Sequence, residues 1–229
     1  MIGSSASLPV LHRNGRAASL LMLAIVPAQI LLYVLFPPPG SASGWLDLFA
    51  SSPLQGLIGL DLLYILNNSL LILIYLSLWD ICRKPSPGGA ITALVLGLTG
   101  IAAYFGSNPA FEMLNLSRQW SLVSSSAGEA AVLGAAEALL AGYTGTAFNA
   151  YYLLNDAALW IFAVILYRSN AVGRRVAVAA LISALFMLVP SSFGTPGIVA
   201  SLLSLPPWCL FLAWMSVHMK KFSLQKEDL

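Results

Sequence analysis

Charged residues are scarce in this sequence. Of 229 residues, 9% are Asp, Glu, Lys or Arg and 59% are hydrophobic, whereas about a quarter of the residues in a soluble globular protein are charged. This composition excludes a soluble domain and predicts an integral membrane protein whose first partner is the lipid bilayer. The net charge is only +2 and the basic residues form no stripe, so we expect no nucleic-acid partner.

Histidine and cysteine are also rare. His12 and His218 lie at the ends of apolar runs, which argues against a histidine-rich metal site or a bis-histidine haem. Cys82 and Cys209 do not form the pattern of an extracellular disulfide framework. The apolar runs contain no lysine, no glycine-rich phosphate loop is present, and no serine has a base nearby in sequence. We therefore expect no metal, no cofactor and no catalytic residue.

Long apolar runs, by contrast, are abundant. A helix that crosses the hydrocarbon core needs about 20 mainly apolar residues. Six stretches qualify, of which the fifth is the weakest: 17–36, 54–79, 89–106, 146–167, 175–193 and 197–217. The first follows a basic start but lacks a small-residue cleavage site, so we interpret it as an uncleaved helix. The sequence predicts one all-α transmembrane domain over residues 1–229, a bundle of six helices.

Lysine and arginine set the orientation, because cytoplasmic loops carry an excess of them. In the six-helix arrangement, ten of the eleven basic residues fall on the side of the two termini: Arg13, Arg16, Arg83, Lys84, Arg168, Arg174, Arg175, Lys220, Lys221 and Lys226. Only Arg118 falls on the other side. Both termini are therefore predicted to be cytoplasmic.

The segment 107–145 is predicted to be external. It contains a helix at about 127–141 that begins at the capping-box pattern SAGE, residues 126–129. A seventh span here is the alternative, but the helix is short, carries Glu129 and Glu137, and would move three arginines to the outside. Together with the first external loop it could form a lid, or it could simply cover the helix ends.

Two of the expected spans carry a matching set of polar residues. The stretches 61–79 and 149–167 align at an offset of 88 residues, and the matched pairs are Asp61 with Asn149, Tyr64 with Tyr152, Asn67 with Asn155 and Asn68 with Asp156. Three of these pairs, all but Asn67 with Asn155, share one helical face, because their positions follow the spacing i, i+3 and i+7. We interpret the match as a possible parallel internal repeat; chance similarity between apolar segments is the alternative.

Energetics predict where these side chains point. A carboxylate near the membrane centre costs about 2.5–3.5 kcal/mol on insertion scales, so ionisable residues face the bundle interior or a water-filled cavity. We expect a polar pocket, open to the outside, in which Asp156 holds a proton and hydrogen-bonds Asn68 or Tyr64. The asparagines could instead serve only to join helices. An acid dyad of Asp61 and Asp156 is disfavoured by their different depths.

The C-terminal half resembles a known bacterial family. A Gly-Thr entry to the span 146–167, the turn YRSNAVGRR and the Pro-Trp of LLSLPPWCLFLAW resemble the multi-pass family filed as domain of unknown function 4386. The resemblance covers about 100 residues closely. It implies a bacterial inner-membrane protein of six or seven helices and carries no activity with it.

The predicted function is to bind or transport a small molecule or a proton in this pocket. The residues predicted to line it are Asp61, Tyr64, Asn67, Asn68, Asn149, Tyr152, Asn155 and Asp156. The rival hypothesis is a non-catalytic sensor or accessory subunit with a membrane-protein partner, in which these residues only join helices. An intramembrane enzyme is the third hypothesis, and it lacks a nucleophile or metal in the sequence.

Overall fold

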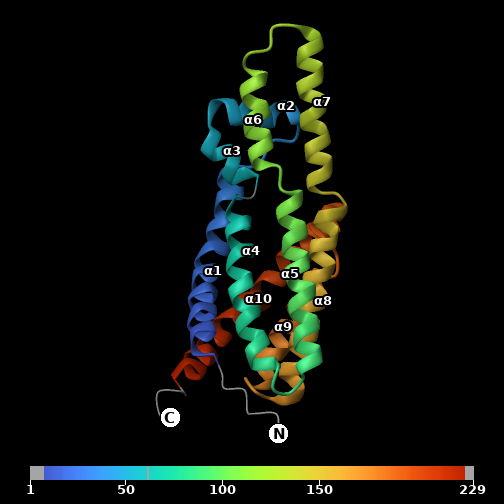
Figure 1. Cartoon of the computed structure of the whole chain (residues 1–229). Coiled ribbons are helices and arrows are strands. Elements are labelled where there is room, and N and C mark those ends of the chain that lie inside the picture. Colours follow the sequence, from blue (N-terminus) through green and yellow to red (C-terminus); the bar gives the residue numbers. More distant parts are fainter. Residues whose placement is uncertain (1–7, 61, 225–229) are drawn as a thin grey trace.

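The computed structural model describes residues 8–60 and 62–224, and within them it is helical throughout. The elements are α1 (Pro9–Leu35), α2 (Ala42–Ser51), α3 (Pro53–Gly59), α4 (Leu62–Cys82), α5 (Pro87–Ser107), α6 (Ala110–Trp120), α7 (Ser126–Tyr143), α8 (Thr146–Ser169), α9 (Arg174–Met187), the 3-10 turn η1 (Ser191–Phe193) and α10 (Gly194–Leu224). Figure 1 shows an elongated bundle in which α1 begins and α10 ends at the same end.

Five stretches within the described residues are long and apolar enough to cross a membrane. They are Pro9–Leu35, Leu62–Cys82, Pro87–Trp120, Ser126–Ser169 and Ser191–Leu224. The chain is therefore an α-helical bundle compatible with a multi-pass membrane protein. Helix α9 has 14 residues, which at about 1.5 Å per residue is shorter than the roughly 30 Å hydrocarbon core. That the chain crosses the membrane six times therefore stays a prediction.

The expected helix at 54–79 is divided in two, which corrects the sequence prediction. Helix α3 occupies Pro53–Gly59, and α4 begins at Leu62. Leu60 ends α3, and its backbone N–H donates to the carbonyl of Gly56. Gly56 and Gly59 are weak helix formers, and Gly56 packs so closely on the ring of Phe49 that a Cβ would overlap it.

Helices α2, α3, α6 and α7 form a separate cap on the end of the bundle that lies away from the start of α1 (Figure 1). The cap has its own apolar core, which includes Trp45, Phe49, Met113 and Val132. The Trp120 indole donates a hydrogen bond of 2.9 Å to Asp47, which joins α6 to α2. This cap lies beyond the ends of α4, α5 and α8 (Figure 1). Helices α6 and α7 belong to two of the stretches that are apolar enough to cross a membrane, so an external segment stays a prediction.

Helix α7 confirms a helix near 127–141 but starts at a different cap. The N-cap is Ser125, whose hydroxyl accepts a hydrogen bond from the N–H of Gly128. The capping-box pattern had indicated Ser126. Three consecutive serines precede the helix, and the backbone at Ser125 is extended as an N-cap requires.

The main bundle is organised around α5, which packs along α8 and also contacts α4. Two glycines allow this close approach. A Cβ on Gly97 would overlap the ring of Tyr75 from α4, and a Cβ on Gly100 would overlap the amide of Asn155 from α8. Small residues at helix interfaces let backbones and bulky side chains approach in this way. The glycines thus fix where Tyr75 and Asn155 sit.

Candidate functional site

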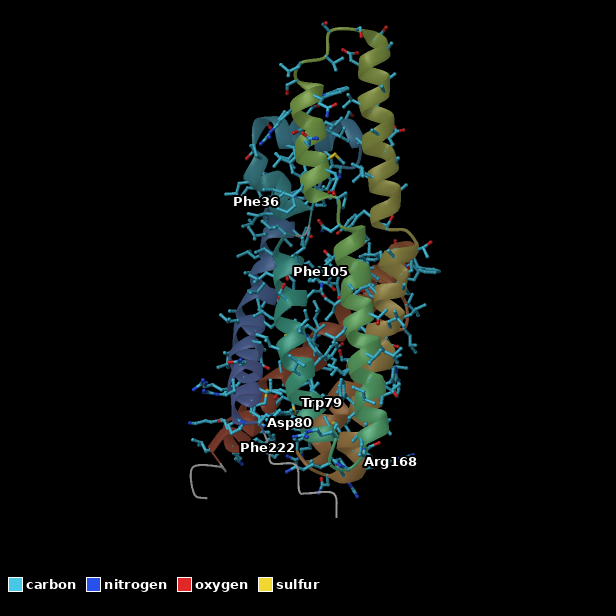
Figure 2. The ribbon with its side chains drawn as sticks, in the orientation of Figure 1. Phe36, Trp79, Asp80, Phe105, Arg168 and Phe222 are labelled. Atoms are coloured by element: carbon cyan, nitrogen blue, oxygen red, sulfur yellow. The ribbon has the colours of Figure 1, made fainter. Side chains whose placement is uncertain are left out.

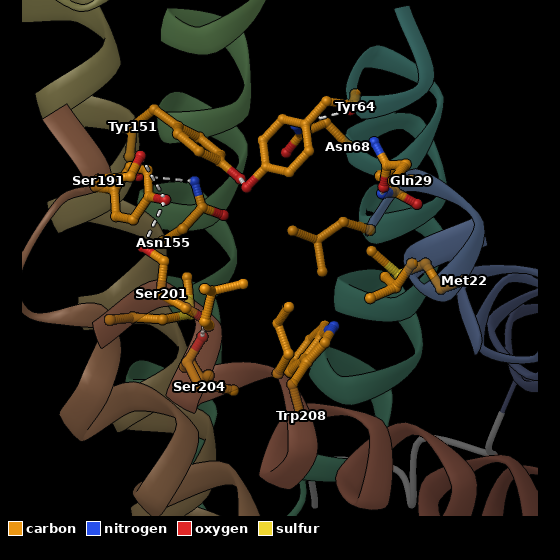
Figure 3. A pocket seen from close by; sticks show the side chains of 18 of the residues that line it. Met22, Gln29, Tyr64, Asn68, Tyr151, Asn155, Ser191, Ser201, Ser204 and Trp208 are labelled. Carbon is orange, nitrogen blue, oxygen red and sulfur yellow. Dashed lines mark hydrogen bonds between the residues drawn. The ribbon is translucent and has the colours of Figure 1, made fainter. Parts of the chain in front are cut away.

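A cavity of about 330 Å³ lies inside the bundle (Figure 3). Its walls come from α1, α4, α8 and α10, and the turn between α9 and α10 closes one side. Residues of α1 that line it include Met22 and Gln29, and Trp208 of α10 lies at the end nearest the termini (Figure 3). A volume of this size falls within the range of small-molecule sites, about 300–1,000 Å³.

The α4 wall carries Asn67 and Asn68, both more than nine-tenths buried. The Asn68 amide donates 3.0 Å to the carbonyl of Tyr64 in its own helix, whereas the Asn67 amide donates to the side chain of Gln29 on α1. The Oδ1 atoms of both asparagines have no hydrogen-bond partner among the described residues. Two side chains of the cavity wall therefore each carry a buried oxygen that accepts no hydrogen bond from the described residues.

The α8 wall carries Tyr152 and Asn155. Asn155 accepts a hydrogen bond of 2.9 Å from the hydroxyl of Tyr75, which joins α8 to α4. Tyr152 donates 3.1 Å to Ser191 and lies 3.2 Å from the hydroxyl of Ser201. The Asn155 amide donates 3.0 Å to the carbonyl of Tyr151 in its own helix, so Asn155 differs from Asn68 in that its Oδ1 has a partner on another helix.

A tyrosine pair crosses the cavity at the end nearest the cap (Figure 3). The hydroxyl of Tyr151 donates 3.0 Å to the hydroxyl of Tyr64, and the two rings meet edge to face with centroids 6.0 Å apart. Tyr104 of α5 packs edge to face on Tyr64 at 5.0 Å and lies at 5.0 Å from the Tyr151 ring. This aromatic cluster separates the cavity from the cap.

Five of the eight predicted residues line the cavity: Tyr64, Asn67, Asn68, Tyr152 and Asn155. Asn149 lies off it, at the start of α8, and accepts 2.6 Å from the hydroxyl of Ser192. Asp156 is buried but does not line the cavity, and its role in binding stays a prediction. Asp61 lies outside the described residues.

The expected hydrogen bond between Asp156 and Asn68 is absent in the part of the chain that the structure describes. Oδ1 of Asn68 and Oδ1 of Asp156 both lack a partner there, and the Asn68 amide is engaged with Tyr64. The physical reason is that α4 and α8 meet through other pairs, Tyr75 with Asn155 and Tyr64 with Tyr151, so the matched positions Asn68 and Asp156 do not bond each other.

Sequence reasoning missed several lining residues. Gln29 is an isolated amide within an apolar run, so the rule that singled out the asparagines would also have found it. No sequence pattern distinguishes the other missed residues from the remaining tyrosines and serines of the chain. They are Tyr75, Tyr151, Ser191 and Ser201. A second cavity, of about 220 Å³, shares Gln29 with the first and extends between α1 and α3.

A second polar cluster joins α1 to α4 near the termini. His12 Nε2 lies 2.9 Å from a carboxylate oxygen of Asp80, and His12 Nδ1 lies 3.0 Å from Oγ of Ser77. Arg83 also donates to Asp80, at 2.7 Å, and Phe222 of α10 packs on the His12 ring at 5.4 Å. Figure 2 shows Asp80 and Phe222 at this end.

The serine, histidine and aspartate of this cluster have the connectivity of a catalytic triad. Catalysis needs access for a substrate, and the three side chains are at most 1% exposed. A Cβ on Gly15 would come 2.6 Å from the Cβ of Ser77, so α1 covers the hydroxyl directly. The arrangement is a hydrogen-bonded clamp between helices. Among the described residues no group of three His, Cys, Asp or Glu side chains could hold a metal ion.

Comparisons of the chain with protein-family models, with curated proteins and with solved structures give no match.

Proposed function

We propose that this chain is a multi-pass membrane protein that binds a small molecule in the cavity between α1, α4, α8 and α10, either as a step of transport or as a signal. The observation that carries the proposal is the side chain of Asn68. It is 1% exposed, it lines the cavity, and among the described residues its only hydrogen bond is to its own helix.

This geometry is not what a helix-joining asparagine needs. Such a residue acts through a bond to another helix, and Asn68 makes none among the described residues. A buried acceptor without a partner costs about 1–3 kcal/mol. A hydrogen-bond donor on a ligand in the cavity would remove that cost once the Asn68 side chain turns its buried oxygen towards the ligand. The same argument applies to Oδ1 of Asn67.

Orientation and origin belong to the proposal as well. With the basic residues on the cytoplasmic side, we propose that the tyrosine pair and the cap lie towards the outside. The aromatic cluster then lies between the cavity and the outside, and an opening of the pocket to the outside stays a prediction. The resemblance to the family of unknown function 4386 supports a bacterial inner membrane as the location. If the transported species is a proton, Asp156 is the residue we propose to hold it, because it is a buried carboxyl group with an unpaired oxygen.

The second candidate is a sensor or accessory subunit whose polar residues only join helices. Three cross-helix bonds favour it: Asn67 with Gln29, Asn155 with Tyr75, and Tyr64 with Tyr151. These bonds engage most of the polar side chains in the cavity wall. They do not involve Asn68, so a helix-joining role does not explain that residue. In this case the cavity would bind nothing specifically, and a protein partner would occupy an outer face of the bundle.

A pair of bulky substitutions on α1 tests the proposal. Val26 lines the cavity, so Val26→Phe fills part of it, whereas Val34 is exposed on the same helix and Val34→Phe is the matched control. Purified wild type and both variants are melted with a panel of neutral, anionic and cationic small molecules. We expect at least one compound to raise the Tm of wild type and Val34→Phe and to leave Val26→Phe unchanged. If all three proteins respond alike to every compound, the cavity is not a binding site.

A further inference from the structure

The chemistry of the cavity wall restricts what it can hold. Aliphatic and aromatic side chains make up most of the lining, and its polar groups are amides, hydroxyls and the indole N–H of Trp208. No Asp, Glu, Lys, Arg or His among the described residues lines it. A charged ligand in such a site would lose its hydration without a counter-charge, which costs several kcal/mol, so the lining fits a neutral molecule.

Two buried oxygens in the wall are acceptors without a donor among the described residues. They are Oδ1 of Asn67 and Oδ1 of Asn68. A ligand that satisfies them must itself donate, through a hydroxyl or an amide N–H. A ligand that only accepts hydrogen bonds, such as an ether, would leave both oxygens as they are.

The cavity also has a side opening. At the cap end the Tyr64–Tyr151 pair and its aromatic neighbours cross it. Between α1 and α10, however, lining residues are exposed on the outer surface of the bundle: Ile30 is 40% exposed and Leu202 is 52% exposed. In a membrane this surface faces the acyl chains, so the opening leads into the bilayer and not into water.

We infer that the ligand of this cavity is a neutral, lipid-soluble molecule with a hydroxyl or amide donor, which enters from the bilayer between α1 and α10 and donates to Asn67 and Asn68. The inference rests on the proposed function and adds the class of ligand and its route. The amides hold the polar end, and Met22, Leu71 and Trp208 contact the apolar part.

The ligand class is tested by competition. A dodecanol that carries a diazirine is photo-crosslinked to the protein in phosphatidylcholine vesicles, and adducts are mapped to α1 and α10. The competitors are 1-dodecanol, its methyl ether, dodecanoate and dodecylammonium. We expect 1-dodecanol to compete about tenfold better than the ether in wild type, the upper end of what one hydrogen bond contributes. Asn68→Leu should remove most of that difference.

The outcomes of this competition separate the inference from the proposed function. If the alcohol and the ether compete equally in wild type, or if dodecanoate or dodecylammonium competes best, the ligand class is wrong. The cavity would still be a binding site if Val26→Phe abolishes the labelling. If no probe labels the cavity, the inference fails, and the water-soluble panel described above decides the proposed function separately.

The route is tested by a second pair of variants on α10. Leu202 lines the side opening, and its neighbour Leu203 is similarly exposed but does not line the cavity. We expect Leu202→Trp to slow the labelling of the cavity at least threefold and Leu203→Trp to leave the rate unchanged. Equal rates in the two variants would overturn entry between α1 and α10.

Discussion

Asn68 and Asn155 are the same residue type in the same cavity wall, yet they make different bonds. Asn155 accepts from Tyr75, whose hydroxyl is buried, whereas the one bond that Asn68 makes within the described part of the chain is to the backbone of its own helix. The contrast separates a structural amide from one that is available to a ligand.

Replacing each asparagine by leucine should therefore have different effects on stability. Asn155→Leu leaves the Tyr75 hydroxyl without its acceptor and should lower the free energy of unfolding by about 1–3 kcal/mol. Asn68→Leu removes an unsatisfied acceptor at similar volume and should leave the free energy of unfolding unchanged or raise it by up to about 1–3 kcal/mol. Equilibrium unfolding in detergent measures both, and equal losses would assign Asn68 to a structural role.

For single residues, the sequence predicts which polar side chains are energetically unfavourable in a membrane, but it does not predict their hydrogen-bond partners. Tyr64 pairs with Tyr151 and not with Asp156, because partner choice depends on the rotation of α8 about its axis. That rotation is set by packing on α5, which no local pattern records. Asn149, at the start of α8, bonds Ser192, a contact equally invisible in the sequence.

Among the helices, α5 determines how the cavity walls are spaced. The side chain of Tyr75 from α4 packs directly on Gly97, and that of Asn155 from α8 packs directly on Gly100. Periodicity and apolar length predict that α5 exists, but its two contact glycines look like any others in an apolar helix. The break between α3 and α4 was missed for a related reason, since the apolar run continues across it.

A pair of alanine substitutions in α5 tests this role. Gly100→Ala places a methyl group where the Asn155 amide lies, while Gly106 has nothing within 4 Å of an added Cβ. Overpacking costs about 1–3 kcal/mol, so we expect Gly100→Ala to lower the Tm clearly. Gly106→Ala should leave the Tm unchanged or raise it slightly, because alanine favours helix. Equal Tm values would show that α5 can shift freely against α8.

For the molecule as a whole, the composition alone predicts a multi-pass helical protein, and the basic residues predict its orientation. The start of α1 and the end of α10 lie together and opposite the cap (Figure 1), which agrees with termini on one side. The number of crossings could not be fixed from the sequence, because α9 is too short to span by itself and α7 belongs to a stretch that is apolar enough to span.

Cysteine labelling in intact cells tests the orientation. In a chain with Cys82→Ala and Cys209→Ala, Leu122→Cys lies at the exposed tip of the cap and Ala171→Cys lies in the exposed turn before α9. A membrane-impermeant maleimide should label Leu122→Cys from outside and Ala171→Cys only after lysis. Labelling of both from outside would mean that α7 crosses the membrane, and labelling of Ala171→Cys alone from outside would mean that the orientation is reversed.

The most direct test of ligand binding is protection of a cysteine in the cavity wall. Ser201 lines the cavity, so Ser201→Cys, in a chain without the two native cysteines, should react with N-ethylmaleimide. A compound that raises the Tm should slow this reaction in a saturable way, and Val26→Phe should abolish the protection. If the compound raises the Tm and the reaction rate stays constant, it binds elsewhere and the cavity is not the functional site.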